Sequence, residues 1–268
     1  MYQKPREGEQ EAAFRTALSQ MQILYAHQKT LTYLLTKHPE WTVAPSWDCK
    51  EYAFRGWPNF EQRVTMLLKL SSSVAWKNAV DVGTPDAKKL VPLTPEAFEK
   101  LLTTLAFTNG ADTEVVAGLY HKTIDDALSQ TTSLRFVKED WGDSEIRELV
   151  QVLPLCKQLR RLALDENPKM TSAAARTLAK ALKDGAAPNL THLGIEAGLT
   201  GTSALAKSRE LKAACDARGI ECVRFAGLIH QKVKAMSANR KGKWRQVKEK
   251  AVLVDRRDRE AHALALAV

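Results

Sequence analysis

The sequence predicts an α/β fold in which short strands and helices alternate as repeated units. A Leu-x-x-Leu-x-Leu-x-x-Asn phrase stands in full at Leu159, Leu162, Leu164 and Asn167. The same spacing returns in weaker form, so that the frame begins at about 131, 159, 190 and 220. Apolar residues two apart mark a short strand with one buried face, and the Asn can hydrogen-bond the backbone of the turn that follows.

The three weaker frames keep the apolar offsets. They are Thr131, Leu134, Phe136 and Glu139; then Leu190, Leu193 and Ile195; then Ile220, Val223 and Phe225. Helical periodicity fills the intervals, over 144–153, 171–182 and 202–217. One strand and one helix cannot bury their apolar faces alone, so we expect neighbouring units to stack.

This pattern resembles the ribonuclease-inhibitor class of leucine-rich repeat, over about residues 131–227. The resemblance implies a short solenoid of about four units across 131–229, with a helix on the convex side of each unit. Glu139, Gly198 and Leu228 stand where the turn Asn would be, so we expect irregular turns there. An ordinary α/β domain whose strands recur is the alternative.

Residues 1–70 predict an incomplete α/β segment. Phe14, Leu18, Met21 and Tyr25 form one stripe of an amphipathic helix over 8–28. The run Thr30–Thr36 is rich in β-forming residues, and a strand that is apolar on both faces belongs in the interior of a sheet. The chain begins only seven residues before this helix, so we expect the segment to lack the strands that would lie beside it.

The order of these elements, with M-Y-Q-K-P-R before the helix and Y-A-F-R-G-W-P-N-F-E at 52–61 after the strand, supports a second resemblance. It resembles the latter part of a domain related to the heterokaryon-incompatibility and Toll/interleukin-receptor families, as found in large and mostly uncharacterised algal families. That resemblance implies a truncated domain over about 1–70.

The same resemblance implies one catalytic residue. In NAD-cleaving members of the Toll/interleukin-receptor family, a glutamate follows a tryptophan by four residues, and Trp57 and Glu61 keep that spacing. A carboxylate there would stabilise the oxocarbenium-like state as nicotinamide leaves. An acidic residue in the first turn of a surface helix, which complements the helix dipole, is the structural interpretation of Glu61.

Residues 71–93, with their Ser, Gly and Pro content, predict a linker over the surface. A helical pair is expected over 94–130, with Thr94 capping the first helix and Asp112 the second. Because the ends of a solenoid expose apolar surface, we expect this pair to cover the first unit.

The net charge of +9 is concentrated in the tail. Residues 230–268 hold eleven Lys and Arg against four Asp and Glu, so +7 of the total belongs there. The tail predicts a basic helix or partial disorder, with three roles open: a solvated terminal helix, a nucleic-acid or partner contact, or a membrane-surface helix. Lys241, Lys243, Trp244 and Arg245 are the contact residues it would use.

Other chemistry is not indicated by the sequence. Phosphate-binding glycine loops, H-E-x-x-H and G-x-S-x-G are all missing, and the four cysteines form no C-x-x-C pair. We therefore expect no metal and no cofactor, except NAD under the enzyme alternative. With no apolar run of about 20 residues and no secretory signal at the start, we expect a cytoplasmic or nuclear protein with reduced thiols.

The sequence thus predicts a non-enzymatic interaction or scaffold protein, in a signalling setting, that docks a protein partner on the concave strand face. The residues expected to point outward there are Arg135, Val137, Ala163, Asp165, His192, Gly194 and Arg224. Of these, Arg135, Asp165, His192 and Arg224 are the predicted partner-binding residues. Their mixed charge favours a protein over a phosphate backbone. The alternatives are an NAD-cleaving signalling enzyme using Glu61 and a nucleic-acid binder acting through the tail.

Overall fold

A computed structural model of the chain describes residues 7–27, 30–37, 52–68, 79–82, 88–195 and 204–223. The chain divides into two compact units, Met1–Phe225 and Ala226–Val268, and all described residues belong to the first.

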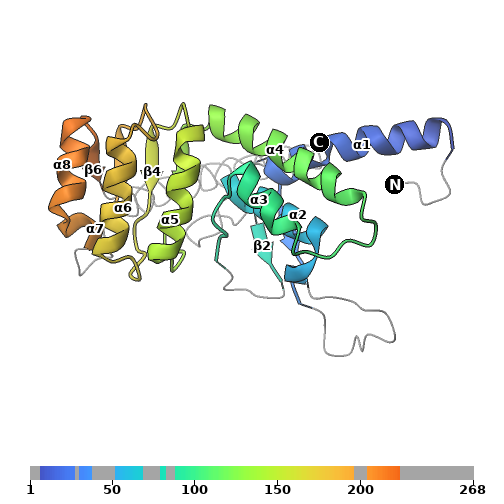
Figure 1. Cartoon of the computed structure of the whole chain (residues 1–268), viewed down its shortest axis with the longest axis horizontal. Coiled ribbons are helices and arrows are strands. Elements are labelled where there is room, and N and C mark those ends of the chain that lie inside the picture. Colours follow the sequence, from blue (N-terminus) through green and yellow to red (C-terminus); the bar gives the residue numbers. More distant parts are fainter. Residues whose placement is uncertain are drawn as a thin grey trace, which may run out of the picture. The chain divides into compact units, whose positions relative to one another are not determined.

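The elements of the N-terminal half of the first unit are α1 (Glu9–Ala26), β1 (Thr32–Leu34), η1 (Tyr52–Phe54), α2 (Gly56–Leu68), β2 (Ala79–Asp81), α3 (Pro95–Leu102) and α4 (Asp112–Gln130) (Figure 1). Those that follow are β3 (Ser133–Arg135), α5 (Asp143–Val152), η2 (Leu153–Leu155), β4 (Arg161–Ala163), α6 (Ser172–Lys183), β5 (His192–Gly194), α7 (Ala204–Lys207), α8 (Arg209–Ala217) and β6 (Glu221–Val223).

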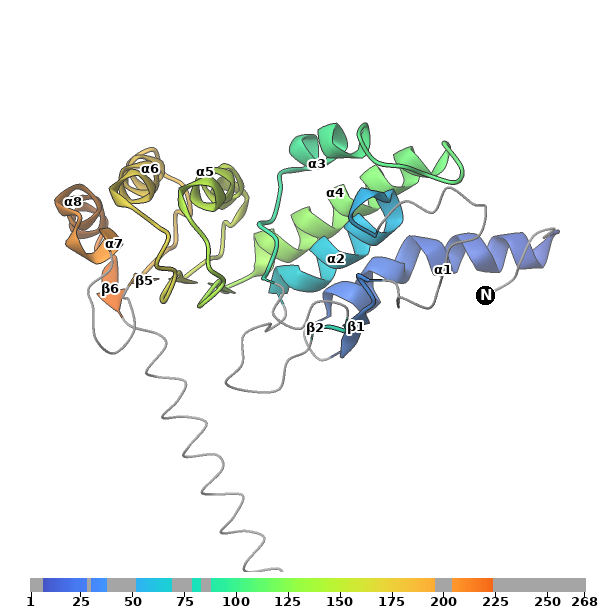
Figure 2. The ribbon, with the colours of Figure 1, turned by 90° about the horizontal axis from the view of Figure 1, so that it is seen from below.

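The strands β3, β4, β5 and β6 form a four-stranded parallel sheet in which they lie in sequence order. Helices α5, α6 and α8 lie in a row on one side of the strands (Figure 2), and α6 packs against both of its neighbours. The predicted mixed α/β class is therefore confirmed.

Strict register places equivalent side chains in rows across this sheet. Leu134, Leu162 and Leu193 form the middle row, and each is at most 1% exposed because it faces the helices. In β6 the residue in this row is Cys222, and Val223 pairs with Gly194 instead. The predicted fourth frame is thus wrong by one residue, since the turn before β6 is one residue shorter than the apolar spacing suggested.

Side chains bind backbone groups near the helix ends of neighbouring units. Asp143, at the start of α5, accepts hydrogen bonds from the backbone N–H groups of Thr171 (2.8 Å) and Ala174 (3.2 Å) at the start of α6. The guanidinium of Arg218 donates to the carbonyls of Leu182, Ala186 and Ala187 at 2.6–2.9 Å. These bonds satisfy backbone groups that a helix leaves without an internal partner at each end.

The turn after β4 is built around Asn167, which is 4% exposed. Its Oδ1 accepts the backbone N–H groups of Glu139 (2.9 Å) and Trp141 (3.1 Å). Its Nδ2 donates to the carbonyls of Phe136 (2.6 Å), Leu164 (2.9 Å) and Asp165 (3.3 Å). One amide therefore fixes the turn of its own unit and that of the preceding unit.

The N-terminal half has a helical core. Phe60 of α2 is fully buried, and Phe98 of α3 stacks on Tyr120 of α4 with ring centroids 3.8 Å apart. Helix α1 lies where a helix was predicted and packs on α2 and α4. Its buried side chain is Gln22, however, and the residues of the predicted apolar stripe, Phe14, Leu18, Met21 and Tyr25, are only partly buried. The strand predicted to be buried on both faces is instead half exposed. It is β1, which pairs in parallel with β2, and alternate side chains such as Tyr33 (62%) and Leu35 (68%) are exposed.

Two further sequence expectations need correction. Residues 88–93 do not run over the surface as a linker, because Lys89 and Val91 are buried against neighbouring elements. The N-cap of α3 is Thr94 as predicted, with its Oγ1 accepting from the N–H of Ala97. Asp112, in contrast, does not cap α4; its carboxylate accepts from the Trp57 indole (2.9 Å) and from Asn109 (3.0 Å).

Replacing Asn167 by Ala should lower the free energy of unfolding by about 3 kcal/mol, because several buried backbone groups lose their partner at once. Asn189 is a matched control: it is exposed and donates one hydrogen bond, to the carbonyl of Lys157. Asn189→Ala should lower the free energy of unfolding by less than about 1 kcal/mol. Urea unfolding of both variants measures the difference, and equal losses would contradict the role assigned to Asn167.

Candidate functional site

The face of the four-stranded sheet opposite the helices carries one accessible polar row. Ser133, Arg161, His192 and Glu221 are register partners on adjacent strands. Arg161 and Glu221 are exposed, and Ser133 and His192 are partly exposed. We call these four residues the polar row.

His192 is held in the polar row by its neighbours. Its Nδ1 lies 2.8 Å from Oγ1 of Thr191, which in turn donates to the carbonyl of Arg160. Its Nε2 lies 3.5 Å from Oε2 of Glu221, whose side chain is 70% exposed. The imidazole is therefore positioned at the surface with one edge against a carboxylate.

Other residues predicted to point outward are not accessible. Asp165 is fully buried, Ala163 is 2% and Val137 8% exposed, and Gly194 is also buried. Asp165 lies beyond the end of β4, in the turn that Asn167 organises, so the alternation of a strand no longer decides where its side chain points. The prediction that Asp165 contributes to an open docking face is wrong.

Arg135 is partly exposed and interacts within the molecule. Burial lowers the pKa of its guanidinium, and the carboxylate of Asp165 opposes that shift. The predicted pair Arg135 and Asp165 is thus brought together, but as an internal charge pair beside the polar row.

Arg161 and Glu221 were not among the residues predicted to point outward. They stand two residues before Ala163 and Val223, so strand alternation places them on the same face.

Lys89 lies at the first edge of this sheet and is 4% exposed. Its backbone N–H donates to Oε2 of Glu139 (2.9 Å), and its Nζ donates to the carbonyl of Arg135 (3.2 Å). Its ammonium also lies 5.5 Å from the centre of the Phe136 ring, and its carbonyl accepts from the Trp141 indole. Burial lowers the pKa of Lys89 to about 8, with Glu139 opposing the shift.

Glu61, the residue expected for NAD cleavage, lies in α2 and is half-buried. Burial raises the pKa of its carboxyl, while a hydrogen bond from Tyr25 and the charge of Arg55 oppose the shift. The same carboxylate contributes, after burial, to raising the pKa of Tyr25 to about 12. Glu61 therefore joins α2 to α1 through a phenol and a carboxylate.

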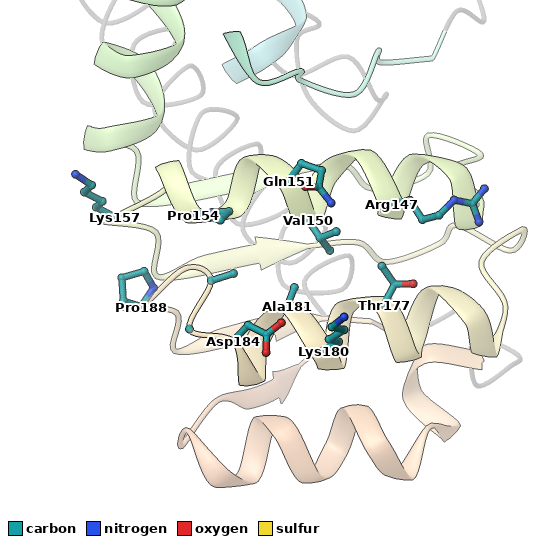
Figure 3. Close-up of a pocket in the computed structure, with 12 residues that line it drawn as sticks. Arg147, Val150, Gln151, Pro154, Lys157, Thr177, Lys180, Ala181, Asp184 and Pro188 are labelled. Atoms are coloured by element: carbon teal, nitrogen blue, oxygen red, sulfur yellow. The ribbon is translucent and has the colours of Figure 1, made fainter. Parts of the chain in front are cut away.

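A groove of about 750 Å³ lies on the helix side of the sheet, between α5 and α6 (Figure 3). Val150 and Ala181 form part of its apolar wall, and both are partly exposed. Its charged lining residues are Arg147, Lys157, Lys180 and Asp184. On α6 the groove is lined by Thr177, Lys180 and Ala181, and no motif of the sequence indicates it.

The remaining predicted contact residues, Arg224 of the docking face and Lys241, Lys243, Trp244 and Arg245 of the tail, lie outside the described residues. Within the described part of the chain, no group of three or more His, Cys, Asp or Glu side chains could hold a metal ion. No helix among the described residues has the length and apolar character needed to cross a membrane.

Comparison of the chain with family models, curated proteins and solved structures finds no match.

The low pKa of Lys89 predicts how stability depends on pH. Between about pH 8 and the unfolded value of 10.5 the unfolded chain binds more protons than the folded one, so stability should rise with pH in this window. Across this pH window the free energy of unfolding of the wild type should rise by about 3 kcal/mol relative to that of Lys89→Met. Lys88→Met, at an exposed neighbour, is the control and should follow the wild type. Parallel pH profiles for Lys89→Met and wild type would refute the burial of this charge.

Proposed function

We propose that the protein is a non-enzymatic interaction or scaffold protein, and that residues 131–223 form a short leucine-rich-repeat solenoid with a docking surface on its strand face. Parallel strands in sequence order, helices on one side only and an Asn that spans two turns support this proposal. So does the leucine row that each unit buries against its helix. As a fold-level analogy the solenoid alone does not define a function.

The observation that carries the docking function is the polar row. A sheet whose other face packs against helices presents Arg161, His192 and Glu221 from three adjacent strands. Residues in register on parallel strands form an ordered array, so their relative positions are set by the backbone rather than by flexible loops. Binding then requires little reordering, which favours affinity.

The charges of the polar row indicate the chemistry of the partner. Arg161 and Glu221 are two strands apart, which places them about 10 Å from each other in the sheet. A segment in the extended polyproline-II conformation advances by about 3.1 Å per residue and returns to the same face every third residue, so an acidic and a basic side chain three positions apart would match them. We therefore propose that the partner offers an extended segment with opposite charges at that spacing. Because the row carries charges of both signs, it suits a protein segment better than a phosphate backbone.

Selection of displayed random peptides on the immobilised full chain tests this proposal. Enriched peptides should carry an acidic and a basic residue three positions apart. Arg161→Glu and Glu221→Lys should each weaken binding at least about tenfold, since each places like charges opposite one another. The double variant should recover binding to a peptide with the two charges exchanged. Arg176→Glu, on the exposed face of α6, is the matched control and should leave affinity unchanged.

Failure of Arg161→Glu to change affinity, or equal loss in Arg176→Glu, would contradict the assignment of the polar row. Recovery with exchanged charges is the stricter criterion, because a variant that had merely lost its structure could not show it.

An NAD-cleaving activity centred on Glu61 is the second proposal. Its support is a half-buried carboxyl with a raised pKa beside Arg55 and Tyr25, a combination common in active sites. Four residues before it, Trp57 keeps the spacing expected of such enzymes, although its indole binds Asp112.

If this second proposal holds, the full chain should release nicotinamide from NAD, and Glu61→Gln should reduce the rate at least about a hundredfold. Glu96→Gln, a change in the first turn of α3, is the control. Release that is undetectable in the wild type, or unaltered in Glu61→Gln, would exclude the activity.

A further inference from the structure

Two cysteines face each other at the last strand of the described sheet. Cys222 occupies the row filled in the other strands by Leu134, Leu162 and Leu193, so its side chain is directed toward the helix layer. Cys215 lies in α8, the helix that packs against β6, and is fully buried. Gly219, with φ at +65°, reverses the chain between them.

The two thiols are in hydrogen-bond contact, and Cys222 is the exposed member of the pair. The hydrogen bond from Cys215 lowers the pKa of Cys222, with a smaller contribution from Lys212, while partial burial and the charge of Asp216 oppose the shift. The pKa of Cys215 is raised by the same contact and by its burial. The arrangement places an exposed cysteine beside a buried one.

We propose that Cys222 is a peroxide-sensitive modification site and that Cys215 is its resolving residue, the two forming a reversible intramolecular disulfide. The thiolate is the nucleophilic form of cysteine, and low-pKa exposed cysteines beside a second thiol are those that oxidise readily. Cys156 provides the contrast within the same molecule. It is buried, its Sγ contacts the carbonyl of Val152, and burial raises its pKa to about 12.

The chemistry balances with hydrogen peroxide as the oxidant. The Cys222 thiolate attacks one peroxide oxygen, the O–O bond breaks, and a proton from solvent completes the water that leaves, giving a sulfenic acid at Cys222. The Cys215 sulfur then attacks the Cys222 sulfur and releases its proton, and the hydroxyl leaves as a second water. Two sulfurs have lost one electron each, and peroxide has been reduced to water. A small thiol reverses the reaction by exchange.

This cross-link would join α8 to β6 next to Glu221, at one end of the polar row. The inference does not depend on the docking function, because it concerns the reactivity of the two thiols alone.

Peptide mass analysis of the reduced full chain after hydrogen peroxide treatment and alkylation tests the proposal. Trypsin cuts after Lys212, Arg218 and Arg224, so the two cysteines fall in separate peptides, 213–218 and 219–224. Oxidation should join them into one species that is lighter by two hydrogen atoms than the two reduced peptides together. Treatment with a small dithiol should restore both.

Before oxidation, alkylation of Cys222 at neutral pH should be at least about tenfold faster than that of Cys156. In Cys215→Ser the joined species should be lost, and Cys222 should be found as sulfenic acid or as a mixed disulfide with added thiol. In Cys222→Ser, Cys215 should stay reduced.

Recovery of both peptides unlinked from peroxide-treated wild type would overturn the proposal, and so would alkylation of Cys156 as fast as Cys222. Both readouts use the unaltered chain, so they decide the question even if a substitution at the buried Cys215 destabilises the fold.

Discussion

The amide of Asn167 is the interaction on which the rest of the sheet region depends. It satisfies two N–H groups and three carbonyls that lie in the turns after β3 and β4, where no strand or helix can pair them. Buried backbone groups without partners are costly, so these turns can be closely packed only with such a side chain in place. Closely packed turns in turn allow β3 and β4 to align residue for residue, and this alignment produces both the leucine row and the polar row.

In the first unit a different residue stands at the position of Asn167, and its contacts explain how the edge of the sheet is covered. Glu139 stands in the place of Asn167, and its carboxylate accepts the N–H of Lys89 from a segment far away in the sequence. The Trp141 indole binds the carbonyl of that same residue, and its ring stacks on Phe136. The segment before α3 therefore closes the exposed edge of the sheet. The buried ammonium of Lys89 is held there by the carbonyl of Arg135 and the ring of Phe136.

Much of this architecture could be predicted from the spacing of apolar residues. Leu159, Leu162, Leu164 and Asn167 predict a strand and the turn after it, and Thr94 followed by Pro95 predicts a helix start; the structure has both. The role of Lys89 could not be predicted, because Ser, Gly and Pro mark a loop without saying what the loop covers. Asp165 was misassigned because strand alternation was extended past the end of β4. The shift at β6 followed from the shorter turn, which let Cys222 take a position that the apolar pattern gave to Val223.

We propose that the strand face, and not the helix face, meets a partner. The most direct measurement places a photo-cross-linking amino acid at His192 in the polar row and, separately, at Arg176 on α6, in the cells that make the protein. The account predicts one defined cross-linked species from position 192 that is missing from position 176 and is lost on Arg161→Glu. Cross-links from position 176 alone, or the same species from both positions, would contradict it.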